Sequence, residues 1–339
     1  MVYLVCYDWL NTRGNHAGMS HLCDMLVAYY PNEIKVIKDY ELRATHYFTY
    51  NCINRKIDYY RKAKQNRKFT LHFHKMLRQL KDGDVVLLME YICPSVDQTL
   101  LAKQIKERNF NVKVVGLAHL TPSKLKELNI GTKEVLECVG CVDFIMTLGH
   151  SLSDWIVEQG IDKRKVITAF HYVDFEYYHR ITPVTTDGVK VICMGNLQRN
   201  FAILEEIIRK CPSVEFTICS GILNLSRFEI YKNVRLLGYI NEEQLRSEME
   251  SANVSLNVMD DTVGSNVITT SMAMGLAMVV SDVGSIRDYC DDTNAFFCRD
   301  IDDYVKALQS LNIQKMSESS IKKAQSLSVI RFAESVINC

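Results

Sequence analysis

The segment from Asp261 to Gly275 combines small residues and hydroxyl groups directly after an expected strand at Val254–Val258. Its turn, Gly264-Ser265-Asn266, has short side chains that leave backbone N–H groups free to bind an anion. Ser265 or Asn266 can cap the helix that follows, and Gly275 can end it. The residue types and their order therefore predict a site for phosphate and sugar hydroxyl groups at the start of a helix.

Arg199 and His119 each follow an expected strand, which is where ligand contacts are made in a parallel sheet. Arg199 ends the segment Gly195-Asn196-Leu197-Gln198-Arg199, just before a helix, so its guanidinium group can bind a phosphate that the helix N-terminus also attracts. His119 can hydrogen-bond a sugar hydroxyl group. The alternatives are a solvated arginine and a histidine that caps a helix or lies at the edge of the core.

The turn after the first expected strand carries Ala17 and Gly18 at the start of a helix. Small residues there allow the backbone to approach a phosphate group. The segment lacks the G-x-G-x-x-G spacing, so it does not predict a dinucleotide-binding site. An ordinary loop with a glycine turn is the alternative interpretation.

Short apolar runs alternate with longer amphipathic segments along the first half of the chain. The apolar runs are typical of strands buried on both faces, and we expect such strands at Val2–Tyr7, Ile34–Ile37, Asp84–Met89, Val112–Leu117, Asp143–Leu148 and Lys165–Phe170. The amphipathic segments predict helices at Gly18–Tyr30, Thr70–Lys81, Val96–Asn109, Ser123–Val139 and Leu152–Gly160.

The same alternation restarts after the polar segment Ile181–Gly188. It predicts strands at Val189–Met194, Val214–Cys219, Val234–Leu236, Val254–Val258 and Met278–Ser281, and helices at Phe201–Lys210, Glu242–Ser251, Val267–Met274 and Asp302–Leu311. Alternating strands and helices predict an α/β protein with two doubly wound domains, residues 1–180 and 181–315, and an active site in the cleft between them. The amphipathic tail, residues 316–339, is expected to cross back to the first domain.

The overall composition excludes several classes of protein. The 339 residues carry no formal net charge, which argues against a dedicated nucleic-acid binder. No apolar run is long enough to cross a bilayer, and the first residues are expected to form a strand rather than a signal peptide. The twelve scattered cysteines suit reduced thiols in a cytoplasmic protein.

Two short motifs are typical of metal or redox sites but are interpreted here as structural. Cys138 and Cys141 form a C-x-x-C without a second ligand pair, and Asp300-Ile301-Asp302 forms a D-x-D just before an amphipathic helix. We expect buried cysteines in the first case and a helix cap in the second. The sequence therefore predicts no metal site.

A basic segment from Arg55 to Lys81 contains ten lysines and arginines, interleaved with aromatic residues such as Tyr59 and Tyr60. Its first part defines the basic patch, which comprises Arg55, Lys56, Arg61, Lys62, Lys64, Arg67 and Lys68. Such a patch is typical of a surface that binds anionic lipid head groups. An anionic acceptor and a solvated helix face are the alternatives, and no nucleic-acid recognition module accompanies the patch.

The order of these features resembles the retaining GT-B glycosyltransferases of family 4 over most of the chain. The resemblance is carried by Ala17-Gly18, His119, His171-Tyr172-Val173-Asp174 with its downstream aromatic residues, Arg199, Leu236–Ile240, Met272-Ala273-x-Gly275 and Ser281–Ile286. It implies the GT-B fold and transfer of a hexose from a nucleotide-diphosphate sugar with retention of configuration. The nucleotide sugar would be a co-substrate of UDP or GDP type, with neither a cofactor nor a metal ion required.

The resemblance also assigns roles to individual residues. His119 and Arg199 would be catalytic, and the donor would be bound by Ala17, Gly18, Gly195, Asn196, Tyr239, Thr262, Gly264, Ser265, Asn266 and Thr270. The acceptor would be a glycan or a lipid-linked glycan, which places the protein in the cytoplasm with a peripheral membrane association as a further expectation.

The chain departs from the family pattern where the family has two glutamates, because Thr262 and Thr270 occupy these positions. Asp260 or Asp261 could replace the first glutamate after a small shift of the loop. The phosphate-binding arginine and lysine of the family are reduced to Arg199. The alternatives are therefore a catalytically degenerate GT-B subunit that binds another transferase or a glycan, and a GT-B phosphorylase or sugar-nucleotide epimerase.

Overall fold

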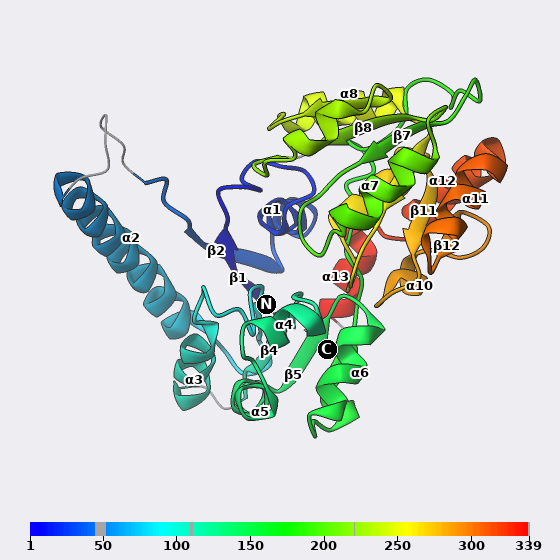
Figure 1. Ribbon diagram of the computed structural model, residues 1–339. Helices are drawn as coiled ribbons and strands as arrows, with labels where there is room; N and C mark the ends of the chain where they lie inside the picture. The colour runs from blue at the N-terminus through cyan, green and yellow to red at the C-terminus, as the bar shows by residue number, and fades with distance from the viewer. Residues whose placement is uncertain (45–51, 109–110, 220, 338–339) are drawn as a thin grey trace.

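The computed structural model describes the chain except for residues 45–51, 109–110, 220 and 338–339. Asn109, where one expected helix ends, and the last two residues of the expected tail lie outside the described residues. Two parallel six-stranded sheets, each covered by helices, form the fold (Figure 1).

The first sheet has the strand order β2-β1-β3-β4-β5-β6. Its strands are β1 (Val2–Asp8), β2 (Ile34–Tyr40), β3 (Val85–Leu88), β4 (Lys113–Ala118), β5 (Phe144–Thr147) and β6 (Val166–Thr168). The helices that follow these strands are α1 (Met19–Tyr29), α2 (Cys52–Gln79), α3 (Gln98–Arg108), α4 (Pro122–Glu127), α5 (Thr132–Val139) and α6 (His150–Glu158). All six strands expected in the first half are present; the apolar side chains of β1, β3, β4 and β5 are mostly buried, whereas those of the edge strands β2 and β6 are mostly half-buried.

The second sheet has the strand order β12-β11-β10-β7-β8-β9. Its strands are β7 (Lys190–Cys193), β8 (Glu215–Cys219), β9 (Val234–Leu237), β10 (Val254–Asn257), β11 (Ala277–Ser281) and β12 (Ala295–Cys298). Its helices are α7 (Phe201–Lys210), α8 (Glu242–Ser251), α9 (Asn266–Ala273), α10 (Ile286–Tyr289) and α11 (Ile301–Ser310). β12 is the one strand here that the sequence pattern did not predict.

The tail forms a pair of helices, α12 (Ile313–Gln325) and α13 (Val329–Ile337). α13 crosses back to the first sheet, where Phe332 and Val336 are buried with Leu4 and Leu22. Figure 1 shows α13 in red between the two sheets. α12 instead packs on α9 and β11 of the second sheet, so the predicted boundary at residue 315 falls inside a helix.

Two expected helices differ from the sequence prediction, and the short helix α10 was not predicted. α2 begins at Cys52, far before the predicted start at Thr70, because its first part is polar on nearly every face and shows no apolar period. The single helix expected over Ser123–Val139 is divided into α4 and α5. Asn129 adopts a φ of 58° between them, a left-handed conformation that ends a helix.

Arg180 anchors the segment that connects the two sheets. Its guanidinium group donates hydrogen bonds of 2.6–3.1 Å to four carbonyl oxygens, those of Met249, Glu250, Ala252 and Met274. These carbonyl groups lie at the ends of α8 and α9, where helices leave acceptors unsatisfied. Arg180 thus fixes the start of the connection to the second unit, and Glu250 adds hydrogen bonds from the backbone N–H groups of Ile181 and Thr182.

We expect Arg180→Ala to lower the free energy of unfolding by about 2–4 kcal/mol, because partly buried carbonyl groups lose a charged donor. Urea denaturation measures this change. Arg164→Ala is the control, because the Arg164 side chain is 90% exposed and pairs with Asp162 at the surface, where water and salt screen the ion pair and its loss should change stability little. Equal effects of the two substitutions would contradict the anchoring role.

Candidate active site in the interdomain cleft

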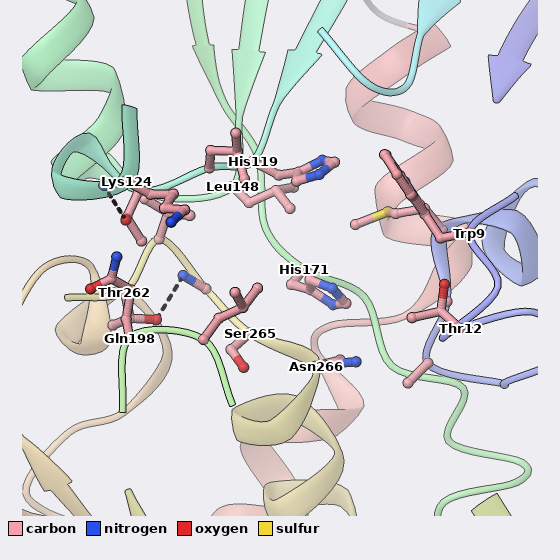
Figure 2. Close-up of a pocket in the computed structure, with 18 of the residues that line it drawn as sticks. Trp9, Thr12, His119, Lys124, Leu148, His171, Gln198, Thr262, Ser265 and Asn266 are labelled. Atoms are coloured by element: carbon pink, nitrogen blue, oxygen red, sulfur yellow. Dashed lines mark hydrogen bonds between the residues drawn. The ribbon is translucent and has the colours of Figure 1, made fainter. Parts of the chain in front are cut away.

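A cavity of about 250 Å³ lies where the carboxyl ends of the two sheets face each other. Tyr7 and Trp9 from the end of β1 and His119 from the end of β4 line it on one side. Arg199 and the loop Asp261–Asn266 line it from the second sheet. Figure 2 shows His119 and Leu148 facing Thr262 and Ser265, with Trp9 and Thr12 along a further side. The cavity is therefore built from both units, as the sequence predicted for the site.

The loop after β10 places the N-terminus of α9 at the cavity. The hydroxyl oxygen of Ser265 accepts a hydrogen bond of 3.2 Å from the backbone N–H of Val267, which confirms the predicted cap. Gly264 has a φ of 100° and packs against the Tyr289 hydroxyl group, so a side chain would not fit. Gly275, with a φ of 66°, ends the helical segment as predicted. These features aim backbone N–H groups at the cavity, where they favour an anion.

Arg199 is a cation with unused donors at the cavity. Its Nε and Nη1 atoms are buried and have no hydrogen-bond partner among the described residues. Burial lowers the pKa of Arg199 to about 10, so the side chain is still charged at neutral pH. The solvated alternative considered for this residue is therefore wrong. A buried guanidinium group without an acceptor is costly, and an anionic ligand would supply the missing acceptors.

Glu90 faces His119 across the first-sheet side of the cavity. The Glu90 side chain is 1% exposed, and its Oε2 lies 3.2 Å from Nε2 of His119. Burial alone would lower the pKa of His119, but attraction to the Glu90 carboxylate outweighs it and raises that pKa above its ordinary value. Neither carboxylate oxygen of Glu90, nor Nδ1 of His119, has a well-formed hydrogen bond among the described residues.

His171 lines the same cavity from the segment after β6. Burial lowers the pKa of His171 to about 4, so its ring is neutral at pH 7. Its Nδ1 lies 3.0 Å from the carbonyl oxygen of Tyr172 and must therefore carry the proton of the neutral ring. The backbone N–H of His171 donates a hydrogen bond of 2.7 Å to the hydroxyl oxygen of Tyr289. His171 thus offers Nε2 as a hydrogen-bond acceptor.

Sequence reasoning missed Glu90 and His171 as site residues. Glu90 comes two residues after the end of β3, and His171 comes three residues after β6. The placement argument applied to His119 would have identified Glu90, because it directly follows the apolar run Asp84–Met89. His171 entered the sequence analysis only as part of the family resemblance, without a role at the site.

Six of the ten residues expected to bind the donor line the cavity, together with both residues expected to be catalytic. The cavity is lined by Ala17, Gly18, His119, Arg199, Thr262, Gly264, Ser265 and Asn266. Gly195 lines a smaller neighbouring cavity beside Arg199. Asn196, Tyr239 and Thr270 line neither of these two cavities. The Tyr239 side chain is 74% exposed, and the Thr270 hydroxyl group already donates to the carbonyl oxygen of Asn266 at 2.6 Å.

Asp261 joins the two units beside the cavity. Its Oδ2 accepts hydrogen bonds from the hydroxyl group of Ser123 at 2.6 Å and from the Ser123 backbone N–H at 3.2 Å. Asp260 instead accepts a hydrogen bond from the side chain of Asn200. Both aspartates considered as replacements for a donor-binding glutamate therefore have protein partners.

A second connection between the units runs through His16, which contacts Asp174 together with His21. Oδ2 of Asp174 lies 2.6 Å from Nδ1 of His16 and 3.1 Å from Nε2 of His21. Among the described residues, this is the one group of three side chains close enough to share a metal ion. Glu242 at the start of α8 accepts a hydrogen bond of 2.9 Å from the backbone N–H of His16. The prediction that the protein needs no metal ion stays a prediction.

The basic patch lies on α2, at the periphery of the first sheet (Figure 1). All its members are exposed, as are Tyr59 and Tyr60. A larger cavity of about 750 Å³ lies between α2 and the ends of β1 and β2, and it shares Tyr7 and Trp9 with the first cavity. None of the described helices combines the length and apolar character that a membrane span requires.

The smaller predicted motifs are structural. The side chain of Asp300 caps α11 by accepting a hydrogen bond from the backbone N–H of Asp303, which confirms the prediction for the D-x-D. Cys138 and Cys141 are free thiols that are half-buried rather than buried as expected, and this partial burial raises the pKa of both.

Residues 188–312 match the family model described as glycosyl transferases group 1. A search of curated proteins found no match. Among solved structures, the chain resembles sucrose-phosphate synthase from Thermosynechococcus elongatus, with a TM-score of 0.71, 12% identity, and coverage of 98% of this chain and 97% of that one. It also resembles the lipopolysaccharide outer core galactosyltransferase WaaB, with a TM-score of 0.67, 14% identity, and coverage of 100% and 99%.

A further similar structure is Alr3699/HepE from Anabaena in complex with UDP-glucose, with a TM-score of 0.68, 10% identity, and coverage of 100% of this chain and 98% of that one. At this level of identity the likeness establishes the fold. The chain has the two-domain GT-B fold expected from its sequence, and the match over residues 188–312 supports a glycosyltransferase.

Proposed function

We propose that the protein is a glycosyltransferase that moves a hexose from a nucleotide-diphosphate sugar to a glycan or lipid-linked acceptor with retention of configuration. One observation carries the proposal: the buried, unpartnered donors of Arg199 share a cavity with the N-terminus of α9. Both groups favour an anion, and the cavity lies between the two units, where ligands of such folds bind. A diphosphate attached to a sugar fits these features.

In this proposal, Arg199 and the backbone N–H groups at the start of α9 bind the diphosphate and stabilise its charge as it leaves. No metal ion takes part in the proposed mechanism. Contacts between the units, such as Asp261 with Ser123, hold the two sides of the cavity together and exclude water. Transfer to an acceptor is then favoured over hydrolysis.

We place the acceptor in the larger cavity, because Tyr7 and Trp9 belong to both cavities and join them. Lys62 of the basic patch lines that cavity as well. A patch that adjoins the acceptor site suits an acceptor held at an anionic membrane surface. We therefore propose a cytoplasmic enzyme bound peripherally to the membrane.

The second candidate is a degenerate GT-B subunit that binds another transferase or a glycan. It is favoured by Thr270, whose hydroxyl group donates within α9 and which lines neither of the two cavities at the site. Binding of a nucleotide sugar without turnover, together with co-purification of a partner transferase, would support it.

We expect UDP or GDP to raise the melting temperature of the protein and Arg199→Ala to abolish this stabilisation. Loss of a buried charged hydrogen-bond donor should weaken diphosphate binding by at least about 30-fold. Isothermal titration calorimetry with UDP and GDP measures the change. Arg227→Ala is the control, because Arg227 is an exposed arginine outside both sites. Binding of either diphosphate to Arg199→Ala with unchanged affinity would contradict the assignment.

The membrane proposal predicts that the protein binds vesicles containing phosphatidylglycerol and that salt weakens this binding. A triple charge reversal on α2, Lys64→Glu with Arg67→Glu and Lys68→Glu, should reduce binding at least about tenfold. Vesicle co-sedimentation measures the effect.

The matched control reverses three exposed lysines on α11 and α12: Lys306→Glu, Lys315→Glu and Lys322→Glu. This variant should bind vesicles like the original protein. Equal losses in both triple variants would show that net charge, rather than the basic patch, governs the interaction.

A further inference from the structure

Glu90 is a buried carboxylate that the protein leaves almost unpartnered. Its side chain is 1% exposed, and Nε2 of His119 at 3.2 Å is the one ionic contact described for it. Neither of its oxygens has a well-formed hydrogen bond among the described residues. Burying a charged group in this way is unfavourable unless a ligand supplies the missing hydrogen-bond donors. The cavity is where such a ligand would lie, because Glu90 lines it.

The backbone around Glu90 is held in place by several contacts. Its N–H donates to the side-chain oxygen of Gln98 at 2.8 Å, and the side-chain nitrogen of Gln98 donates to the carbonyl oxygen of Val5 at 3.2 Å. Ile92, two residues further, adopts a φ of 52°, which is strained for a β-branched residue. Strain of this kind persists where the surroundings fix the chain, commonly at functional sites.

The position of Tyr91 is fixed as well. Its hydroxyl group donates to the carbonyl oxygen of Cys138 at 2.6 Å, and its ring occupies the space where any side chain at Gly116 would lie. Glu90 is thus directed at the cavity by a rigid strand end. A carboxylate held this way is preorganised for a ligand.

The neighbours of Glu90 indicate which ligand fits. His119 presents an unpartnered Nδ1 beside it, and the neutral ring of His171 offers an acceptor to the same cavity. A hydroxyl group both donates and accepts hydrogen bonds, so it satisfies the carboxylate and the imidazole in either protonation state. An acidic group at this place would be repelled by the carboxylate.

We propose that Glu90, together with His119, binds hydroxyl groups of the transferred sugar and selects an uncharged sugar over a uronic acid. This inference rests on the proposed function. Thr262 and Thr270 bring no carboxylate, and Asp261 of the second unit already accepts hydrogen bonds from Ser123. Glu90 brings an unpartnered carboxylate from the first unit. The second unit would then bind the nucleotide diphosphate, and the sugar attached to that diphosphate would contact the first unit.

The test compares nucleotide and nucleotide-sugar binding in the full-length protein and in Glu90→Gln by calorimetry. The probes are UDP, GDP and ADP, their glucose conjugates, UDP-galactose and UDP-glucuronate. We expect Glu90→Gln to bind the best neutral conjugate about tenfold more weakly, because a charged hydrogen bond is lost, and to bind the nucleotide alone equally well. Its discrimination against UDP-glucuronate should also fall.

The ligand-free melting temperature distinguishes a binding role from a structural one. Removing a buried charge without a hydrogen-bond partner should leave the melting temperature of Glu90→Gln unchanged or raise it. Glu158→Gln is the matched control, since Glu158 on α6 is exposed and lies outside the cavity lining. This control should bind all probes like the original protein.

Each other outcome overturns the inference in a recognisable way. Unchanged conjugate binding by Glu90→Gln, alongside conjugate binding by the original protein, would leave the proposed function intact and refute the role of Glu90. A lower melting temperature with equal weakening for nucleotide and conjugate would assign Glu90 to the structure alone. If the original protein binds none of the probes, the proposed function fails and the inference fails with it.

Discussion

The burial of the Arg199 guanidinium group without a protein acceptor is the constraint on which the site depends. Two of its nitrogen atoms are buried and unpartnered, yet the residue is still charged at neutral pH because its pKa is about 10. Glu90 imposes the opposite constraint from the first sheet, with a carboxylate that is 1% exposed. Such buried charges are expected where a bound ligand supplies the missing hydrogen-bond partners, and Arg199 and Glu90 line one cavity. The arrangement matches a ligand with an anionic part and a hydroxyl-bearing part.

The fold holds these charges at a fixed separation through connections between the two units. Asp261 accepts hydrogen bonds from Ser123, and Glu242 accepts one from the turn after β1. The connecting segment is anchored by Arg180, and α13 returns to pack on the first sheet. These contacts keep the carboxyl ends of both sheets directed at the same cavity, as ligand binding in doubly wound folds requires.

The sequence predicted the second-unit side of the site well because the chemistry there is local. Ser265 caps α9 and Gly264 needs a positive φ, and both follow from residue type and order. The parallel strands were also predictable, since near-continuous apolar runs show directly in the sequence. The similarity to solved GT-B structures agrees with the strands and helices predicted from the sequence.

The other features of the site and the fold could not be predicted, because they depend on tertiary contacts that a sequence does not reveal. Thr270 aligns with a donor-binding position, but its hydroxyl group is bound by Asn266 within the helix. Glu90 looks like any acidic residue after a strand until its burial is known. The early part of α2 has no apolar period, so its helical structure was not predicted.

The most direct measurement of the central claim is a crystal structure of the protein with its best-binding nucleoside diphosphate. The account predicts that phosphate oxygens lie within hydrogen-bond distance of Nε and Nη1 of Arg199 and of the backbone N–H groups at the start of α9. A diphosphate bound away from Arg199, with the guanidinium group still unpartnered, would contradict it.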